Sequence, residues 1–184
     1  TKPYDFSRPL SEQATYDEAS KRYPLYGVYT EGIDTGLLPT VGDVGYAAWS
    51  LSTEGTLYLR GNGTIADFGW IKNGGVAPTE GYWRPYANAI RAVAMTPSLD
   101  AVACDHWFSF MPQLVDVSQT HLPKSAVTLS RMFRSAPIAT LPENMTMPSG
   151  VTNTHGMFYS CSKLTALPSG FALNDALVNA NSMF

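Results

Sequence analysis

The sequence of 184 residues predicts an α/β solenoid with short parallel strands and an N-terminal β-hairpin cap. The first observation is a Met-Phe pair that occurs three times at nearly equal spacing: Met132-Phe133, Met157-Phe158 and Met183-Phe184. The second is a pair of apolar residues, three positions apart, that recurs with nearly the same period. The third is an alternation of apolar and polar residues before these repeats. A period of roughly 20–50 residues is typical of units that stack because none buries its apolar face alone.

Residues 1–45 are predicted to form an arm with a short helix, packed on the main body. The stretch from Ser11 to Arg22 is compatible with a helix and is followed by Pro24. Ser11 suits the N-cap position, because its hydroxyl accepts a bond from the first free backbone N–H groups. Residues 30–44 are rich in Gly and Asp and are predicted to be a loop.

Residues 46–82 are predicted to form a β-hairpin cap. Ala47, Trp49 and Leu51 alternate with small or polar residues, a turn follows at 53–55, and the alternation resumes afterwards. This pattern is typical of two antiparallel strands with one buried face. A stack of repeats needs such a cap, because its end exposes both core and unpaired strand edges.

Residues 83–184 are predicted to form about four repeats, truncated at the C-terminus. The apolar pairs recur at nearly equal intervals: Ile90 and Val93, Leu114 and Val117, Ile138 and Leu141, Leu164 and Leu167. Each pair is predicted to lie on one short parallel strand, which Pro142 and Pro168 end early because proline has no N–H for the ladder. A large residue before each pair is predicted to begin a helical turn: Trp83, Trp107, Met132 and Met157. The C-terminal end is expected to be apolar and uncapped.

These repeats resemble a known family. The pattern Met-Phe-x-x-Cys-x-x-Leu-x-x-Leu in residues 157–167, with Val-Thr shortly before it, is similar to the BspA-like leucine-rich repeats of bacterial surface proteins. Residues 49–63 resemble the segment that often precedes such repeats. The resemblance implies a leucine-rich-repeat-type solenoid in a secreted or cell-surface bacterial protein. It also implies partners among host or environmental macromolecules, and it carries over no catalytic residues.

The composition argues against several other classes. The net charge is −3, and the 12 Lys and Arg residues are scattered, so no basic stripe predicts nucleic-acid binding. No apolar run approaches the ~20 residues of a membrane-spanning helix, so no transmembrane segment is expected. The two cysteines, Cys104 and Cys161, are predicted to be free thiols, since the repeat register places them too far apart for a disulfide.

The sequence contains no group of residues typical of an active site, and the protein is predicted not to be an enzyme. Cys104, Asp105 and His106 are adjacent, but neighbouring residues rarely face one another as a nucleophile and its base must. No His or Cys spacing typical of zinc and no phosphate-binding glycine loop occurs. We therefore expect no catalytic residue, no metal site and no cofactor.

The candidate binding residues are Trp70, Tyr82, Arg91 and Asp116. Trp70 and Tyr82 flank the glycines at 73–75, and exposed aromatic rings stack on sugars or on partner side chains. Arg91 and Asp116 lie beside the apolar pairs, on the expected open face of the sheet. The sequence favours adhesion or protein–protein recognition, with a protein or a glycan as partner. The alternative is a structural stalk or spacer without a specific partner, and an uncharacterised enzyme ranks third.

Overall fold

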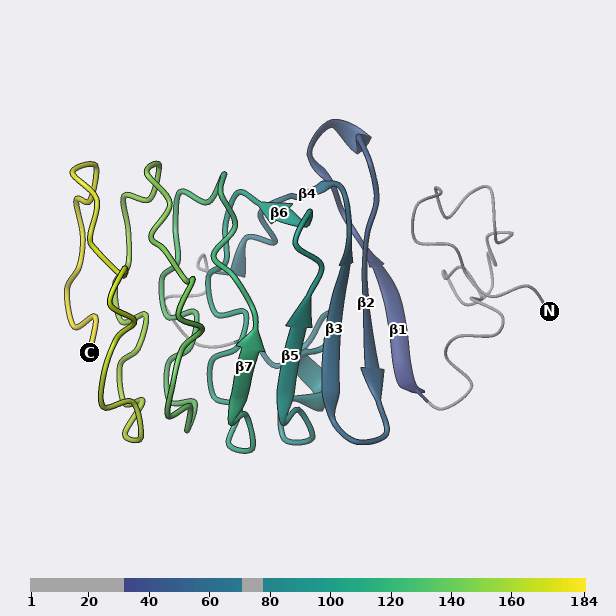
Figure 1. The fold of residues 1–184 in the computed structure, drawn as a ribbon. Helices are drawn as coiled ribbons and strands as arrows, with labels where there is room; N and C mark the ends of the chain where they lie inside the picture. The colour runs from purple at the N-terminus through teal and green to yellow at the C-terminus, as the bar shows by residue number, and fades with distance from the viewer. Residues whose placement is uncertain (1–31, 71–77) are drawn as a thin grey trace.

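The computed structural model describes residues 32–70 and 78–184, and its main feature is one mixed five-stranded sheet (Figure 1). The strand order is β1-β2-β3-β5-β7, with antiparallel pairing from β1 to β3 and parallel pairing from β3 to β7. A second sheet pairs β4 with β6 in parallel. The bounds are β1 Gly32–Leu38, β2 Ala47–Ser52, β3 Thr56–Gly61, β4 Thr64–Ile65, β5 Ala92–Met95, β6 Asp100–Ala101 and β7 Asp116–Gln119.

The predicted α/β leucine-rich-repeat solenoid is wrong. The described residues contain no α-helix, and η2 (Val41–Asp43) and η4 (Arg84–Tyr86) are short 3-10 turns. The fold is small and mostly β, with a mixed sheet and no solenoid closure. The helix predicted for residues 11–22 lies outside the described residues. The division into arm, cap and repeats stays a prediction.

The hairpin formed by β2 and β3 agrees with the alternation in the sequence. The two strands pair in antiparallel register, with Trp49 opposite Leu59, and the predicted turn at 53–55 joins them. In β3 the buried residues alternate strictly with half-buried ones, whereas all of β2 except its last residue is buried. Both edges of β2 are paired, with β1 and with β3, and side chains on both of its faces are buried.

Strand β1 occupies part of a segment that was predicted to be a loop. Its residues do not alternate, yet the strand pairs along the whole of β2. The close packing depends on Gly36, because a Cβ atom there would lie 2.7 Å from the indole Nε1 of Trp49. The sequence pattern did not predict β1, because its pairing with β2 depends on a tertiary contact and not on a local apolar pattern.

The apolar pairs of the repeats lead into parallel strands only in the first two cases. β5 and β7 begin two residues after Ile90 and Leu114 and pair in parallel, with Ala92 opposite Asp116. The third and fourth pairs form no strand, because Pro142 and Pro168 stand where β5 and β7 continue and offer no N–H. Their chain segments still follow the same path, as the neighbouring loops of Figure 1 show.

From residue 103 the chain forms stacked repeat layers, which we define as residues 103–127, 128–152 and 153–178, with a fourth beginning at 179. Parallel bridges join their first residues: Ala103 to Thr128, Thr128 to Asn153, and Asn153 to Asn179. Every second backbone N–H then donates to the next layer. In the second layer these donors are Leu129, Arg131, Phe133 and Ser135, which donate to the carbonyls of Asn153, His155, Met157 and Tyr159.

The same hydrogen bonds explain why no helix follows each large residue. The intervening N–H groups bond within their own layer, to the carbonyl three residues back, as Met132 donates to Leu129. Left-handed residues recur four positions apart in each layer: His106 and Phe110, Arg131 and Ser135, Gly156 and Ser160. An α-helix keeps every residue right-handed and every N–H within itself. Interlayer bonding therefore replaces the predicted helical turns.

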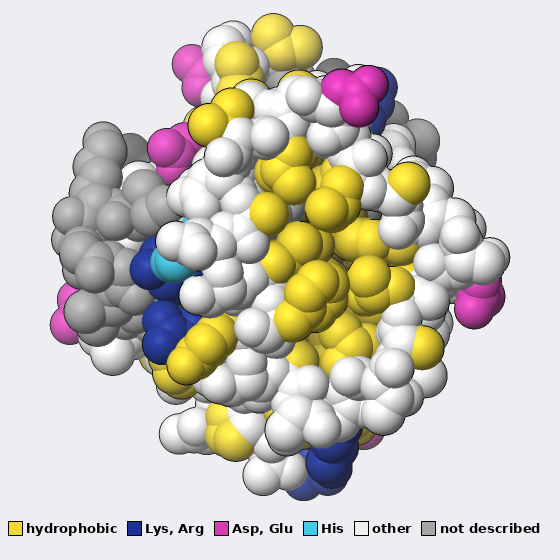
Figure 2. Space-filling model, turned by 90° about the vertical axis from the view of Figure 1, so that its left-hand side faces the viewer, with side chains coloured by type: hydrophobic (Ala, Val, Ile, Leu, Met, Phe, Trp, Pro, Cys, Tyr) yellow, Lys and Arg dark blue, Asp and Glu magenta, His cyan; other side chains and the backbone are white. Residues whose placement is uncertain are grey.

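One continuous apolar core runs through the sheet and the layers. Phenylalanine rings stack along it, with centroid distances of 5.5 Å from Phe108 to Phe133, 5.7 Å from Phe133 to Phe158 and 5.8 Å from Phe158 to Phe184. At the C-terminal end this core reaches the surface: Figure 2 shows apolar side chains gathered in the centre of that face. The last described layer is therefore apolar at this face, and the expectation that this end is uncapped stays a prediction.

Candidate functional site

The predicted binding residues Trp70 and Tyr82 lie together, but in the core. Trp70 is only 9% exposed, and its ring centroid lies 4.8 Å from that of Phe68 and 5.7 Å from that of Trp83. Tyr82 is half-buried, 6.2 Å from Trp70, and burial raises the pKa of its hydroxyl. The two side chains thus join the hairpin to the first repeat, and Trp70 offers little ring surface to a ligand.

Arg91, which precedes β5, and Asp116, the first residue of β7, are exposed neighbours. The carbonyl of Arg91 accepts the N–H groups of Val115 and Asp116, at 3.0 and 3.2 Å. The Asp116 carboxylate accepts the N–H of Ser118 at 2.9 Å, which lowers its pKa. This bond turns the carboxylate toward its own strand. Their binding role stays a prediction.

The Cys104-Asp105-His106 segment is buried. Burial, with the charges of Asp105 and Asp100 nearby, raises the pKa of the Cys104 thiol well above its usual range. The His106 Nδ1 lies 3.0 Å from the Ser109 hydroxyl, but neither residue has any exposed area. A nucleophile needs access and an activated form, and this segment has neither. Cys104 and Cys161 are both free, as predicted, and both are buried.

The searched residues, 32–70 and 78–184, hold no group of three or more His, Cys, Asp or Glu side chains that could bind a metal ion. No helix in that part of the chain is long and apolar enough to cross a membrane.

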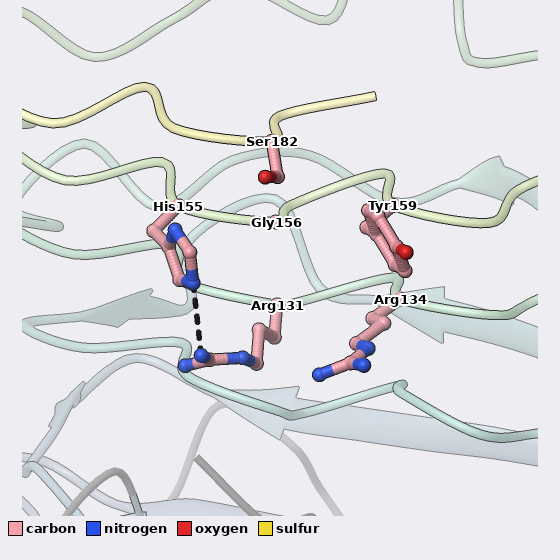
Figure 3. Close-up of a pocket in the computed structure, with 6 residues that line it drawn as sticks. All are labelled: Arg131, Arg134, His155, Gly156, Tyr159 and Ser182. Atoms are coloured by element: carbon pink, nitrogen blue, oxygen red, sulfur yellow. Dashed lines mark hydrogen bonds between the residues drawn. The ribbon is translucent and has the colours of Figure 1, made fainter.

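A hollow that the sequence analysis did not identify lies on the side of the repeat layers, and we call it the arginine pocket (Figure 3). Its volume is about 250 Å³, and its walls come from three successive layers. The lining residues are Arg131, Arg134, His155, Gly156, Tyr159 and Ser182.

The repeat register forms this hollow. Arg131, Gly156 and Ser182 occupy the same left-handed position in three layers, with φ values of 56°, 61° and 50°. A Cβ atom on Gly156 would lie 3.3 Å from Cγ of Arg131 and 3.7 Å from Cβ of Tyr159. The pocket therefore exists because the middle member of the column is glycine. The signal in the sequence was an Arg-x-x-Arg facing a Gly-x-x-Tyr one period later.

The pocket walls carry hydrogen-bond donors that lack an acidic partner. The Arg131 guanidinium donates to Nε2 of His155 at 2.8 Å. Burial, followed by the positive charge of Arg134, lowers the pKa of Arg131. The negative charge of Asp105 acts on Arg131 in the opposite direction, and the buried Nε of Arg134 has no acceptor among residues 32–70 and 78–184.

Two aromatic rings hold Arg134 in place. Its guanidinium carbon lies 5.2 Å from the centre of the Phe110 ring and 5.1 Å from that of Tyr159, both in the range of a cation–π contact. Phe110 and Tyr159 are each 42% exposed. The arrangement presents two cations and flanking ring faces, which suits binding of an anionic group more than bond breaking.

Comparisons with protein-family models, with curated proteins and with solved structures found no match. The BspA-like resemblance stays a prediction based on the repeat residues.

Proposed function

We propose that the protein is a non-enzymatic recognition module that binds carboxylate groups of an acidic protein or glycan in the arginine pocket. The observation that supports this is the pair of guanidiniums, Arg131 and Arg134, without a carboxylate partner in the described residues beside a hollow of about 250 Å³. Arginine binds carboxylates through two parallel hydrogen bonds, and a buried donor without an acceptor gains most from such a ligand.

The proposal includes adhesion at a bacterial cell surface, or in secreted form, as the setting that the repeat resemblance implies. Phe110 and Tyr159 extend the site on either side of Arg134 and supply apolar contact next to the charges. A net charge of −3 disfavours nucleic acid, so we expect the anion to belong to a protein or a polysaccharide.

The test is calorimetric titration of the full chain with two probes, a blocked hexaglutamate peptide and a hexagalacturonate. The variant R131Q/R134Q should bind at least tenfold more weakly, because hydrogen bonds to charged groups contribute about 1.5–3 kcal/mol. The variant K124Q/K163Q removes the same charge from exposed lysines elsewhere and should bind as the wild type does. Gly156→Ser should also weaken binding, because its side chain fills the hollow and keeps both arginine charges.

If R131Q/R134Q and K124Q/K163Q lost the same affinity, the effect would come from net charge alone. That result would refute binding in the arginine pocket. Binding of neither probe would favour the alternative function, a structural stalk or spacer without a specific partner.

A further inference from the structure

A second hollow lies beside η4, and we call it the Arg84 hollow. Its volume is about 460 Å³, and it shares no described lining residue with the arginine pocket. Arg84 is only 5% exposed, and it alone carries a charge among the described residues that line the hollow. Asn88 adds an exposed amide, and the apolar part of the wall consists of Pro78, Pro85, Ala87 and Phe110.

Two neutral carbonyl groups hold the Arg84 guanidinium in place. Its Nε donates to the carbonyl of Pro78 at 2.8 Å, and its Nη1 donates to the carbonyl of Ser109 at 2.8 Å. A guanidinium has five N–H donors, so these two bonds leave others for a ligand. Nη2 has no partner among the described residues and is not an enclosed atom. A ligand in the hollow can therefore reach it.

The positive charge of Arg84 lacks the compensation that Arg131 receives. Burial lowers the pKa of Arg84 to about 10, and no carboxylate among the described residues acts in the opposite direction, as Asp105 does on Arg131. Residues 71–77, which precede the hollow in the sequence, contain no Asp or Glu. A buried charge without a counter-ion is unfavourable, so a carboxylate in this hollow would gain a strong partner.

Arg84 and Arg134 occupy the same position in the stack, two layers apart. Each directly follows an aromatic residue of one column of rings. In this column the ring centroid of Trp83 lies 6.4 Å from that of Phe108, which lies 5.5 Å from that of Phe133. At about 4.8 Å for each layer, the two arginine positions lie roughly 10 Å apart along the stack.

Phe110 connects the two sites. Its side chain lines the Arg84 hollow, and its ring centre lies 5.2 Å from the guanidinium carbon of Arg134, which lines the arginine pocket. The backbone N–H of Phe110 also donates to the carbonyl of Arg134 at 2.7 Å. Because the Phe110 ring is partly exposed, a ligand can pass over it from one cationic site to the next.

We propose that the Arg84 hollow is a second anion subsite, and that the ligand is an acidic chain whose carboxylates, about 10 Å apart, occupy this hollow and the arginine pocket together. This inference rests on the proposed function, because the arginine pocket holds the first carboxylate. Once that carboxylate is bound, the second contact forms within the complex, so the affinity exceeds that of either contact alone. The length of the acidic chain therefore determines how tightly it binds.

Calorimetric titration of the full chain with two blocked peptides, hexaglutamate and diglutamate, tests this dependence on length. Extended hexaglutamate spans roughly 17 Å and reaches both sites, whereas the two side chains of diglutamate point to opposite faces of the peptide. The wild type should bind hexaglutamate at least tenfold more tightly than diglutamate. R131Q/R134Q should weaken the binding of both peptides.

A matched pair of variants locates the second subsite. Asn88→Asp places a carboxylate beside Arg84 that competes with the ligand, and the exposed position should keep the fold. This variant should bind hexaglutamate at least fivefold more weakly and diglutamate as the wild type does. Asn144→Asp makes the same change at an exposed residue outside both sites and should bind both peptides normally. Arg84→Gln should reproduce the loss of Asn88→Asp, with its melting temperature as a check on folding.

Equal binding of hexaglutamate by Asn88→Asp and Asn144→Asp would overturn the second subsite. If R131Q/R134Q still weakened the binding of both peptides, the proposed function would stand without it. Equal affinity of the wild type for the two peptides would also overturn the second subsite. Binding of neither peptide by the wild type would overturn the proposed function and this inference together.

Discussion

The N-terminal sheet and the C-terminal repeat layers achieve the same burial with different backbones. In the sheet, β2 is flanked by β1 and β3, and glycines such as Gly36 allow close packing. In the layers, isolated bridges and left-handed turns replace continuous strands. The repeat period fixes which side chains stack, whereas proline content and ring packing decide the backbone between them.

The two regions also end differently. The hairpin side is joined to the first layers by an aromatic cluster around Trp83, whose Nε1 donates to the carbonyl of Trp107 at 2.8 Å. The last layer has no such cover in the described residues, and equivalent residues there are exposed. A core side chain therefore contributes to stability according to its layer, even when its position in the repeat is the same.

The largest effect should come from the phenylalanine stack. Phe133→Ala should lower the free energy of unfolding by about 3–5 kcal/mol, because a fully buried ring leaves a cavity between two neighbours. Phe184→Ala, at the equivalent end position, should cost less than about 1 kcal/mol, since most of that ring is already exposed. Urea unfolding curves of both variants measure the difference. Similar losses at the two positions would contradict the contrast between inner and end layers.

A somewhat smaller effect is expected at the junction of hairpin and repeats. Trp70→Ala should cost about 3 kcal/mol and lower the melting temperature by several degrees, because Trp70 packs against Phe68 and Trp83. Thermal unfolding followed by circular dichroism provides the measurement, with the exposed Val44→Ala as control. An unchanged melting temperature would contradict a core role and would support the prediction that Trp70 is a binding residue.

The smallest effect depends on pH and comes from Asp105 in the first layer. Burial raises the pKa of this carboxyl to about 6, although the Thr128 hydroxyl donates to it at 2.7 Å. The folded protein binds this proton more tightly than the unfolded chain does, so stability falls as pH rises from about 4 to about 6. Above that window the loss amounts to about 2–3 kcal/mol.

Asp105→Asn removes the ionisation and keeps an oxygen for the Thr128 hydroxyl. The variant should be more stable than the wild type at pH 8 and should lose that advantage near pH 3.5. Urea unfolding at both pH values tests this. An advantage that persists at the acidic pH would show that charge burial is not its cause.

The residues of the candidate site cannot be predicted from the type of each residue alone. Trp70 and Tyr82 are predicted as binding residues because they are aromatic and flank a glycine-rich loop. Large rings near a core are usually buried, and both side chains belong to the aromatic cluster. Arg131, Arg134 and Tyr159 were not selected because each lies alone in the sequence. Only the alignment of one layer over the next brings them together around Gly156.

The sequence alone is enough to predict the repeat period, the β2–β3 hairpin and the residues that stack in the core, because these follow from the spacing of apolar side chains along the chain. It also indicated the apolar C-terminal end, since the last repeat has the same core positions as the others. Tertiary structure alone decided that the turns are left-handed rather than helical, that β1 pairs with β2, and that the arginine pocket exists. The physical reason is that these features depend on hydrogen bonds and close contacts between segments far apart in the chain, which no local pattern records.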